Sequence, residues 1–127
     1  MKIWESGRES DLLDDIVAGR KTIEGRLNRG KFAEYSVGDT VSLRRDYRDA
    51  SGVLRDGESH SARVKIVAIR CYRTFFDMVK NENYKLVIPS ATNAEDAAAV
   101  YNNYYSIQDQ NKHGVLAIEI VHYLSPE

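Results

Sequence analysis

A run of charged and hydroxyl side chains early in the chain is the densest group of residues that could do chemistry. It reads Gly19-Arg20-Lys21-Thr22-Ile23-Glu24-Gly25-Arg26. A lysine in a cleft pairs with a phosphate or polarises a carbonyl, and it becomes a base when it is desolvated. Arg26 suits bidentate recognition of a phosphate. Glu24 would accept hydrogen bonds from a base edge or hold the neighbouring cations in place.

The same residues also allow a structural interpretation. In an extended segment, Lys21 and Ile23 would share one face. Thr22, Glu24 and Arg26 would share the other. Glu24 and Arg26 would then form a surface pair worth under about 1 kcal/mol, and Lys21 would be a solvated lysine near a helix end. A local twist before the strand would instead aim Lys21 and Glu24 into one cleft, so spacing alone leaves both interpretations open.

Other candidate groups lie further along the chain. Tyr105 and Ser106 could supply a stacking ring and a hydroxyl to a ligand site. Cys71, at the end of an apolar segment, is expected to be a small buried hydrophobe. No group of cysteines and histidines has the spacing of zinc ligands. We therefore expect neither a metal nor a cofactor.

The first elements would hold the charged run between a helix and a strand. Ser10 is expected to cap a helix over residues 11–18, because the apolar side chains of this segment recur on one face. Gly19 follows where a residue in the left-handed conformation would end the helix. A strand is expected over residues 21–27.

The middle of the chain predicts strands and turns. A turn at 37–39 precedes a strand over residues 40–45, which is rich in β-branched and aliphatic side chains. Residues 46–61 are polar and contain two glycines, which is typical of a long hairpin connection. Residues 63–72 alternate in character and are apolar on both faces, so we expect a partly buried strand.

The C-terminal third predicts two helices and a last strand over residues 115–123. Thr74 with Asp77 resembles a capping box, and Thr92 with Glu95 matches it more closely. The second helix would bury an apolar stripe made of Ala97, Val100, Tyr101 and Tyr104. These elements together indicate a mixed α+β chain with a small, strongly curved sheet.

The charged run resembles a known family. Gly19-x-Lys21-x-x-Glu24-x-Arg26 is similar to the GxKxxExR signature of the ASCH (activating-signal-cointegrator homology) domain, a branch of the PUA-like superfamily. The turn at 37–39, Tyr72-x-x-Phe75 and Tyr104-Tyr105-Ser106 lie at the expected places. The resemblance covers nearly the whole chain, as one domain over 1–127. It implies an α+β fold, namely a small PUA-like mixed β-barrel with flanking α-helices and a cleft beside the motif.

ASCH proteins are associated with binding of RNA or other nucleic acids. The resemblance therefore implies that the partner is RNA or a nucleotide-like small molecule, held in a basic cleft around the motif. Its candidate ligand contacts are Arg20, Lys21, Thr22, Glu24, Arg26, Tyr105 and Ser106.

A small hydrolase that uses the same cleft is the alternative. One bacterial ASCH branch hydrolyses N4-acetylcytidine with a lysine, a threonine three residues later as nucleophile, and a distant glutamate. Here Lys21 and Glu82 match the lysine and the glutamate. The threonine position holds Glu24, which lacks a hydroxyl nucleophile. A second branch is ribonuclease-like and has basic and hydroxyl side chains in the same cleft. Those roles could be filled here by Lys21, Tyr105 and Ser106. The candidate catalytic residues are Lys21, Glu24 and Glu82.

Composition narrows the class of protein. The chain has 127 residues, which fits one domain. Lys and Arg number 18 against 19 Asp and Glu, so the net charge of −1 excludes a globally basic nucleic-acid wrapper. Residues 20–48 nevertheless hold eight basic and four acidic side chains, a local charge of +4. No apolar leader and no run of about 18 apolar residues is present, so we expect a cytoplasmic protein without a membrane segment.

Overall fold

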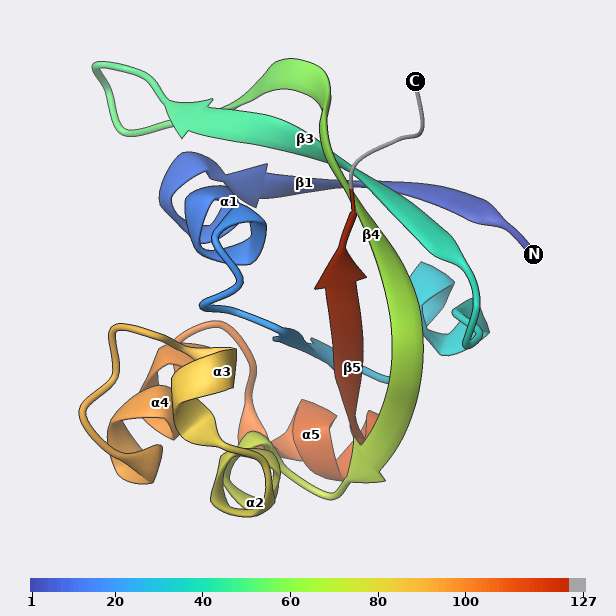
Figure 1. Cartoon of the computed structure of the whole chain (residues 1–127). Helices are drawn as coiled ribbons and strands as arrows, with labels where there is room; N and C mark the ends of the chain where they lie inside the picture. The colour runs from blue at the N-terminus through green and yellow to red at the C-terminus, as the bar shows by residue number, and fades with distance from the viewer. Residues whose placement is uncertain (124–127) are drawn as a thin grey trace.

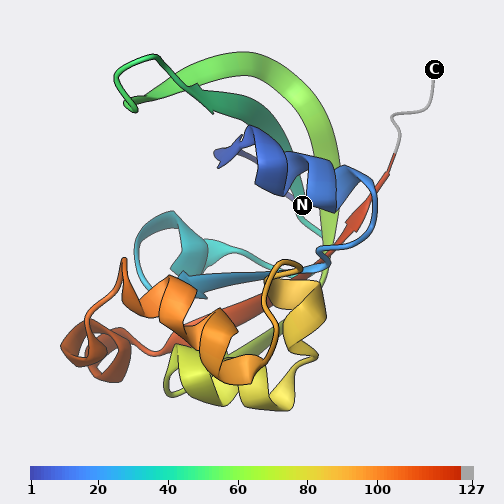
Figure 2. The same cartoon turned by 90° about the vertical axis from the view of Figure 1, so that its left-hand side faces the viewer.

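A computed structural model describes residues 1–123, in which five strands form one sheet in the order β1-β3-β4-β5-β2. The strands are β1 (Ile3–Glu9), β2 (Ile23–Leu27), β3 (Thr40–Arg48), β4 (Leu54–Tyr72) and β5 (Val115–His122). β1 and β3 are parallel, and the other neighbours are antiparallel. β4 is 19 residues long and pairs with β3 along its first part and with β5 along its last part. It curls the sheet into an open half-barrel (Figures 1 and 2).

The helices cover two regions of this sheet. They are α1 (Ser10–Val17), the 3-10 helix η1 (Gly30–Glu34), α2 (Phe75–Asn81), α3 (Tyr84–Val87), α4 (Ala94–Asn102) and α5 (Ile107–His113). α1 lies beside β1, whereas α2 to α5 gather together at the other end of the molecule (Figure 1). None of the helices within residues 1–123 has the length and apolar character needed to cross a membrane.

Side chains alternate between two cores across the sheet. Ile23 and Leu27 of β2 face the helices α2 to α4, together with Val115 and Ala117 of β5. The other face of β5 packs with α1 and β3 inside the half-barrel. The interior core contains Leu13, Ile16, Val41, Leu43, Val64, Ile66, Leu116, Ile118 and Ile120. β2 and β5 therefore bury side chains on both faces in this region.

The expected α+β fold with a curved sheet is confirmed, and so are two helix boundaries. Gly19 follows α1 with φ +78°, the left-handed conformation that ends a helix. Thr74 caps α2, since its side chain accepts a hydrogen bond from the Asp77 amide. The N-cap of α1 is Glu9, and Ser10 is already helical.

Several local expectations were wrong. Residues 46–61 are not a long connection, because β3 continues to Arg48 and β4 begins at Leu54. The two strands continue as a hairpin. Its sequence shows no alternation of apolar and polar residues, so the strands could not be predicted from the pattern. Its short tip is held by Asp49, whose side chain accepts hydrogen bonds from the amides of Ser51 and Val53. Cys71 lies on β4 but is exposed.

The last helical region also differs from its prediction. Asn93, not Thr92, caps α4, because its side chain accepts from the Asp96 amide. Tyr104 follows the end of this helix and is 75% exposed, so it is not part of the core. The short helices α3 and α5 were not predicted, although Ser106 and Asp109 repeat at α5 the capping pattern that Thr74 and Asp77 form at α2.

Candidate functional site at the barrel seam

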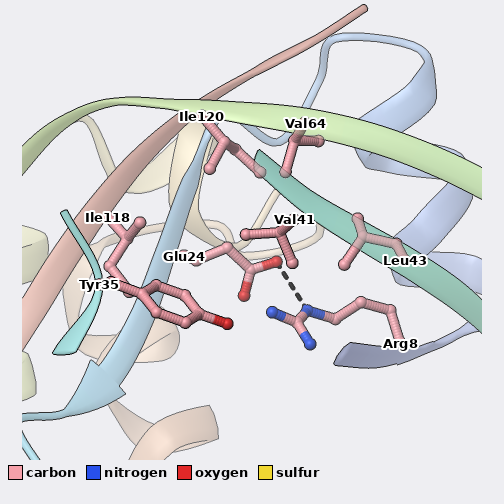
Figure 3. A pocket seen from close by; sticks show the side chains of 8 residues that line it. All are labelled: Arg8, Glu24, Tyr35, Val41, Leu43, Val64, Ile118 and Ile120. Carbon is pink, nitrogen blue, oxygen red and sulfur yellow. Dashed lines mark hydrogen bonds and ion pairs between the residues drawn. The ribbon is translucent and has the colours of Figure 1, made fainter. Parts of the chain in front are cut away.

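The open seam of the half-barrel lies between its two edge strands. Arg8 on β1 and Glu24 on β2 bridge this seam, with Arg8 Nε 2.8 Å from Glu24 Oε1 (Figure 3). Their side chains are only 7% and 5% exposed. Arg8 also donates to Ser6 Oγ and to the Gly7 carbonyl. A buried, hydrogen-bonded ion pair therefore joins the two edges of the sheet.

The charges of this pair stabilise each other inside the protein. Burial alone would raise the pKa of Glu24, but Arg8, Arg26 and Lys21 outweigh burial and hold this pKa well below its usual range. Burial alone would lower the pKa of Arg8, and Glu24 again reverses the effect. Both groups are therefore charged at neutral pH.

A small chamber lies behind the ion pair. Figure 3 shows Arg8, Glu24 and Tyr35 facing apolar side chains of the barrel interior. The apolar wall consists of Val41, Leu43, Val64, Ile118 and Ile120. Tyr35 is 8% exposed, and its hydroxyl is the one buried side-chain polar atom within residues 1–123 that lacks a hydrogen-bond partner. The free volume is about 10 Å³, which is room for roughly one water molecule.

Two further cations stand at the rim of the chamber. Arg26 Nη2 lies 3.4 Å from Glu24 Oε2, and its guanidinium lies over the Phe32 ring at 5.2 Å. Lys31 of η1 lies over the same ring at 5.4 Å and donates to the Glu5 carbonyl of β1. Partial burial and the nearby guanidinium groups lower the pKa of Lys31. Arg8 and Arg26 thus both pair with the Glu24 carboxylate, and Lys31 stands beside Arg26 over Phe32, so the seam keeps an excess of positive charge.

Lys21 does not lie in this chamber. Its side chain is buried, and its Nζ donates to the carbonyls of Ile23 and Val87, which ties α3 to the start of β2. The interpretation of Lys21 as a solvated lysine near a helix end is therefore wrong. Burial lowers the pKa of Lys21 to about 8, although Glu24 acts in the opposite direction.

The buried ammonium of Lys21 makes stability depend on pH. Between pH 8 and the ordinary lysine pKa of about 10.4, the unfolded chain binds a proton that the folded chain has lost. The free energy of unfolding of the natural protein should rise across this interval relative to Lys21→Met, and the difference should be flat below pH 8. Urea denaturation of both proteins at several pH values measures this. Lys80→Met is the control, because Lys80 is exposed, and its difference from the natural protein should not change with pH. A difference between the natural protein and Lys21→Met that stays constant from about pH 8 to the ordinary lysine pKa of about 10.4 would contradict a buried charge at Lys21.

The other predicted contacts of the motif are dispersed. Arg20 is exposed and pairs with Asp15, with Nε 2.7 Å from Oδ1. Thr22 is held through its backbone, because its amide donates to the Leu86 carbonyl and its carbonyl accepts from the Ile120 amide. Of the predicted contacts in the motif, only Glu24 and Arg26 lie at the seam.

Tyr105 and Ser106 support the helical side of the molecule. The Tyr105 ring stacks on Phe75 with centroids 5.2 Å apart, so one of its faces is already covered. Ser106 caps α5, since its Oγ accepts from the Asp109 amide. Both positions thus have structural partners away from the residues that line the chamber.

Glu82 belongs to a separate network. Its carboxylate receives two hydrogen bonds from Arg70, at 2.6 and 2.8 Å, and one from the Tyr72 hydroxyl. Arg70 also contacts Glu119. Lys21, Glu24 and Glu82, the candidate catalytic residues, therefore make their hydrogen bonds in three different networks.

Sequence reasoning missed Arg8, Lys31 and Tyr35 at this site. Each becomes part of it only through folding: Arg8 sits on a strand 16 residues before its partner Glu24. No spacing rule links residues on the two edges of a half-barrel. The alternation of polar residues Ser6 and Arg8 on a short strand was the one local signal.

The fold is an open half-barrel with a charged seam between its edge strands. The chain belongs to the ASCH domain family, whose model matches residues 9–123. This family is generally linked to RNA binding.

Two solved structures resemble the chain over nearly its full length. One is a crystal structure described as hypothetical protein PH0355. It is 32% identical, has a TM-score of 0.79, and the match covers 97% of this chain and 100% of that chain. The other is the solution NMR structure of protein PF0455 from Pyrococcus furiosus, 31% identical with a TM-score of 0.73, covering 96% and 97%. No curated protein matches the chain.

Proposed function

We propose that the chain binds RNA or a nucleotide-like ligand at the seam between β1 and β2. The observation that carries this proposal is the Tyr35 hydroxyl, which lies buried on the Arg8–Glu24 side of the chamber and has no hydrogen-bond partner within residues 1–123 (Figure 3). A buried hydroxyl without a partner costs roughly 1–3 kcal/mol. A ligand that supplies this partner recovers that cost on binding.

The seam offers each kind of contact that a nucleotide needs. The polar edge of a base would meet Tyr35, which can donate or accept, and the charged groups of Arg8 and Glu24. Its ring would lie against the apolar wall of the chamber. A phosphate would be held by Arg26 and Lys31, which stand together over Phe32 at the rim.

Entry of a base requires a movement of Tyr35, because the chamber has space for only about one water. Tyr35 follows η1, a helix with no buried residue. This segment lies between Gly30 and Gly38, which have φ values of +58° and +96°. Opening moves the Tyr35 ring away from Trp4 and Phe32, whose ring centroids lie 5.1 and 5.3 Å from its own, so binding of the base has to compensate for the loss of these contacts. The Tyr35 ring is therefore the gate as well as a contact.

Binding of short single-stranded RNA should be weak and dependent on salt. With about two cations at the rim, we expect a dissociation constant in the micromolar range or above, and a logarithmic salt slope of about −0.7 per phosphate contact. Lys31→Gln should weaken binding and make the slope shallower by about one contact. Fluorescence anisotropy at several salt concentrations measures both quantities.

Lys80→Gln is the matched control, since Lys80 lies on α2 with the other core. Equal effects of the two substitutions, or binding that is unchanged by salt, would contradict a phosphate contact at the rim. The same mixtures are then analysed for cleaved RNA, and a parallel set for deacetylated N4-acetylcytidine. Product formation that Lys21→Met abolishes would favour the hydrolase over the binding protein.

A further inference from the structure

A second group of reactive side chains lies on the outer face of the sheet, away from the chamber. Ser42 on β3 stands directly opposite Glu5 on the parallel strand β1. The Ser42 Oγ lies 2.6 Å from His60 Nδ1, and His60 Nε2 lies 4.0 Å from Glu5 Oε1. Val41 and Leu43, the neighbours of Ser42, point the other way into the chamber. The two sites are thus on opposite faces of one strand.

An irregularity in β4 aims the histidine at the serine. The pairing of β3 with β4 shifts register between Leu43 and Arg45, opposite the segment that contains His60. His60 has φ +56°, the one positive φ of a non-glycine residue within residues 1–123. This conformation costs on the order of 1 kcal/mol or more, and such outliers gather at functional sites. Bulges likewise re-aim side chains next to active sites.

The three side chains have the order of a nucleophile, a base and an orienting carboxylate. Glu5 Oε1 lies 4.0 Å from His60 Nε2, beyond a direct hydrogen bond, and its negative charge favours the histidine tautomer that carries its proton there. Nδ1 then presents a lone pair to the Ser42 hydroxyl and can take its proton. Arg44 lines the same small pocket. Its guanidinium is paired with Asp46, with Nε 2.6 Å from Oδ1, and it faces an oxyanion that forms at the acyl carbon as a paired cation.

We propose that Ser42, His60 and Glu5 form an acyl-accepting site for small activated esters. Ser42 Oγ bonds to the acyl carbon while its proton passes to His60 Nδ1. The carbon–oxygen bond to the leaving group then breaks, and the leaving oxygen takes that proton. Water releases the acyl group as a carboxylic acid by the same steps. The pocket has a volume of about 30 Å³, which restricts the acyl group to a compact one such as acetyl.

The test is acetylation by p-nitrophenyl acetate, followed by intact mass and peptide mapping. We expect one acetyl group on Ser42, formed faster than on any lysine. Ser42→Ala should remove it, and His60→Gln should slow it by roughly 100-fold, since general base catalysis supplies about 10² to 10⁴. Ser59→Ala is the control, because Ser59 lines the same pocket without bonding to His60.

Two outcomes would overturn the proposal. One is acetylation of lysines alone by the natural protein. The other is acetylation of Ser42 at the same rate in the natural protein and in His60→Gln. This variant keeps Ser42, and the substitution does not require the serine to move. Thermal unfolding of each variant confirms that the compared proteins are folded. RNA binding should be unchanged in Ser42→Ala, so the result is independent of the function proposed for the seam.

Discussion

Glu24→Gln should lower the free energy of unfolding by about 3–5 kcal/mol. The substitution keeps the shape of the side chain but leaves the buried Arg8 guanidinium without a carboxylate. A buried charge that loses its partner costs far more than an exposed pair, which is worth under about 1 kcal/mol. Urea denaturation measures the loss. Asp15→Asn is the matched control, because it breaks the exposed pair with Arg20 and should change little.

The double variant Arg8→Met/Glu24→Leu separates a charge effect from a packing effect. It removes both charges and leaves apolar side chains of similar size in an apolar chamber, so it should recover most of the lost stability. It should also fail to bind RNA, since the polar contacts at the seam are gone. A double variant as unstable as Glu24→Gln would show that the pair contributes through its hydrogen bonds to the neighbouring backbone, and not by charge compensation.

Tyr35→Phe should have the opposite profile, with loss of binding and no loss of stability. It removes a hydroxyl that has no hydrogen-bond partner among residues 1–123, so the fold should keep its stability or gain a few tenths of a kcal/mol. A ligand that bonds to this hydroxyl would lose about 1–3 kcal/mol of binding free energy, which is roughly 5-fold to 150-fold in affinity. Anisotropy with short RNA and thermal unfolding measure the two effects.

Tyr104→Phe serves as the control for that experiment, because Tyr104 is largely exposed and lies after α4. Its affinity should match that of the natural protein. If Tyr35→Phe destabilises the chain while binding RNA normally, the hydroxyl has a structural partner such as a buried water, and the seam is not the ligand site.

Features that depend on neighbours in the sequence were predictable. Gly19 ends α1 because a left-handed residue is needed there, and Thr74 caps α2 because its hydroxyl reaches an amide three residues on. The strand alternation also placed Glu24 and Arg26 on one face of β2, and both do face the seam. Local geometry fixes each of these outcomes.

Features that depend on distant segments were not predictable. Lys21 looks like a surface lysine, but α3 folds over it, and the Val87 carbonyl accepts from its ammonium 66 residues away. The β3–β4 hairpin lacks an apolar face, so alternation could not reveal residues 46–61 as strand. Arg8 gains its importance only when the sheet curls and brings its two edges together. Tertiary contacts, and not spacing, decide all three.

The most direct test of a ligand site at the seam is a methyl NMR titration of the natural protein with nucleoside monophosphates. The reporters are the methyl groups of Val41, Leu43, Val64, Ile118 and Ile120, which line the chamber. A base that enters past Tyr35 should shift these resonances together in a saturable way, and should leave those of Val100 and Val121, which are exposed elsewhere, in place. Shifts confined to exposed methyl groups, with the chamber resonances unchanged at saturation, would contradict binding at the seam.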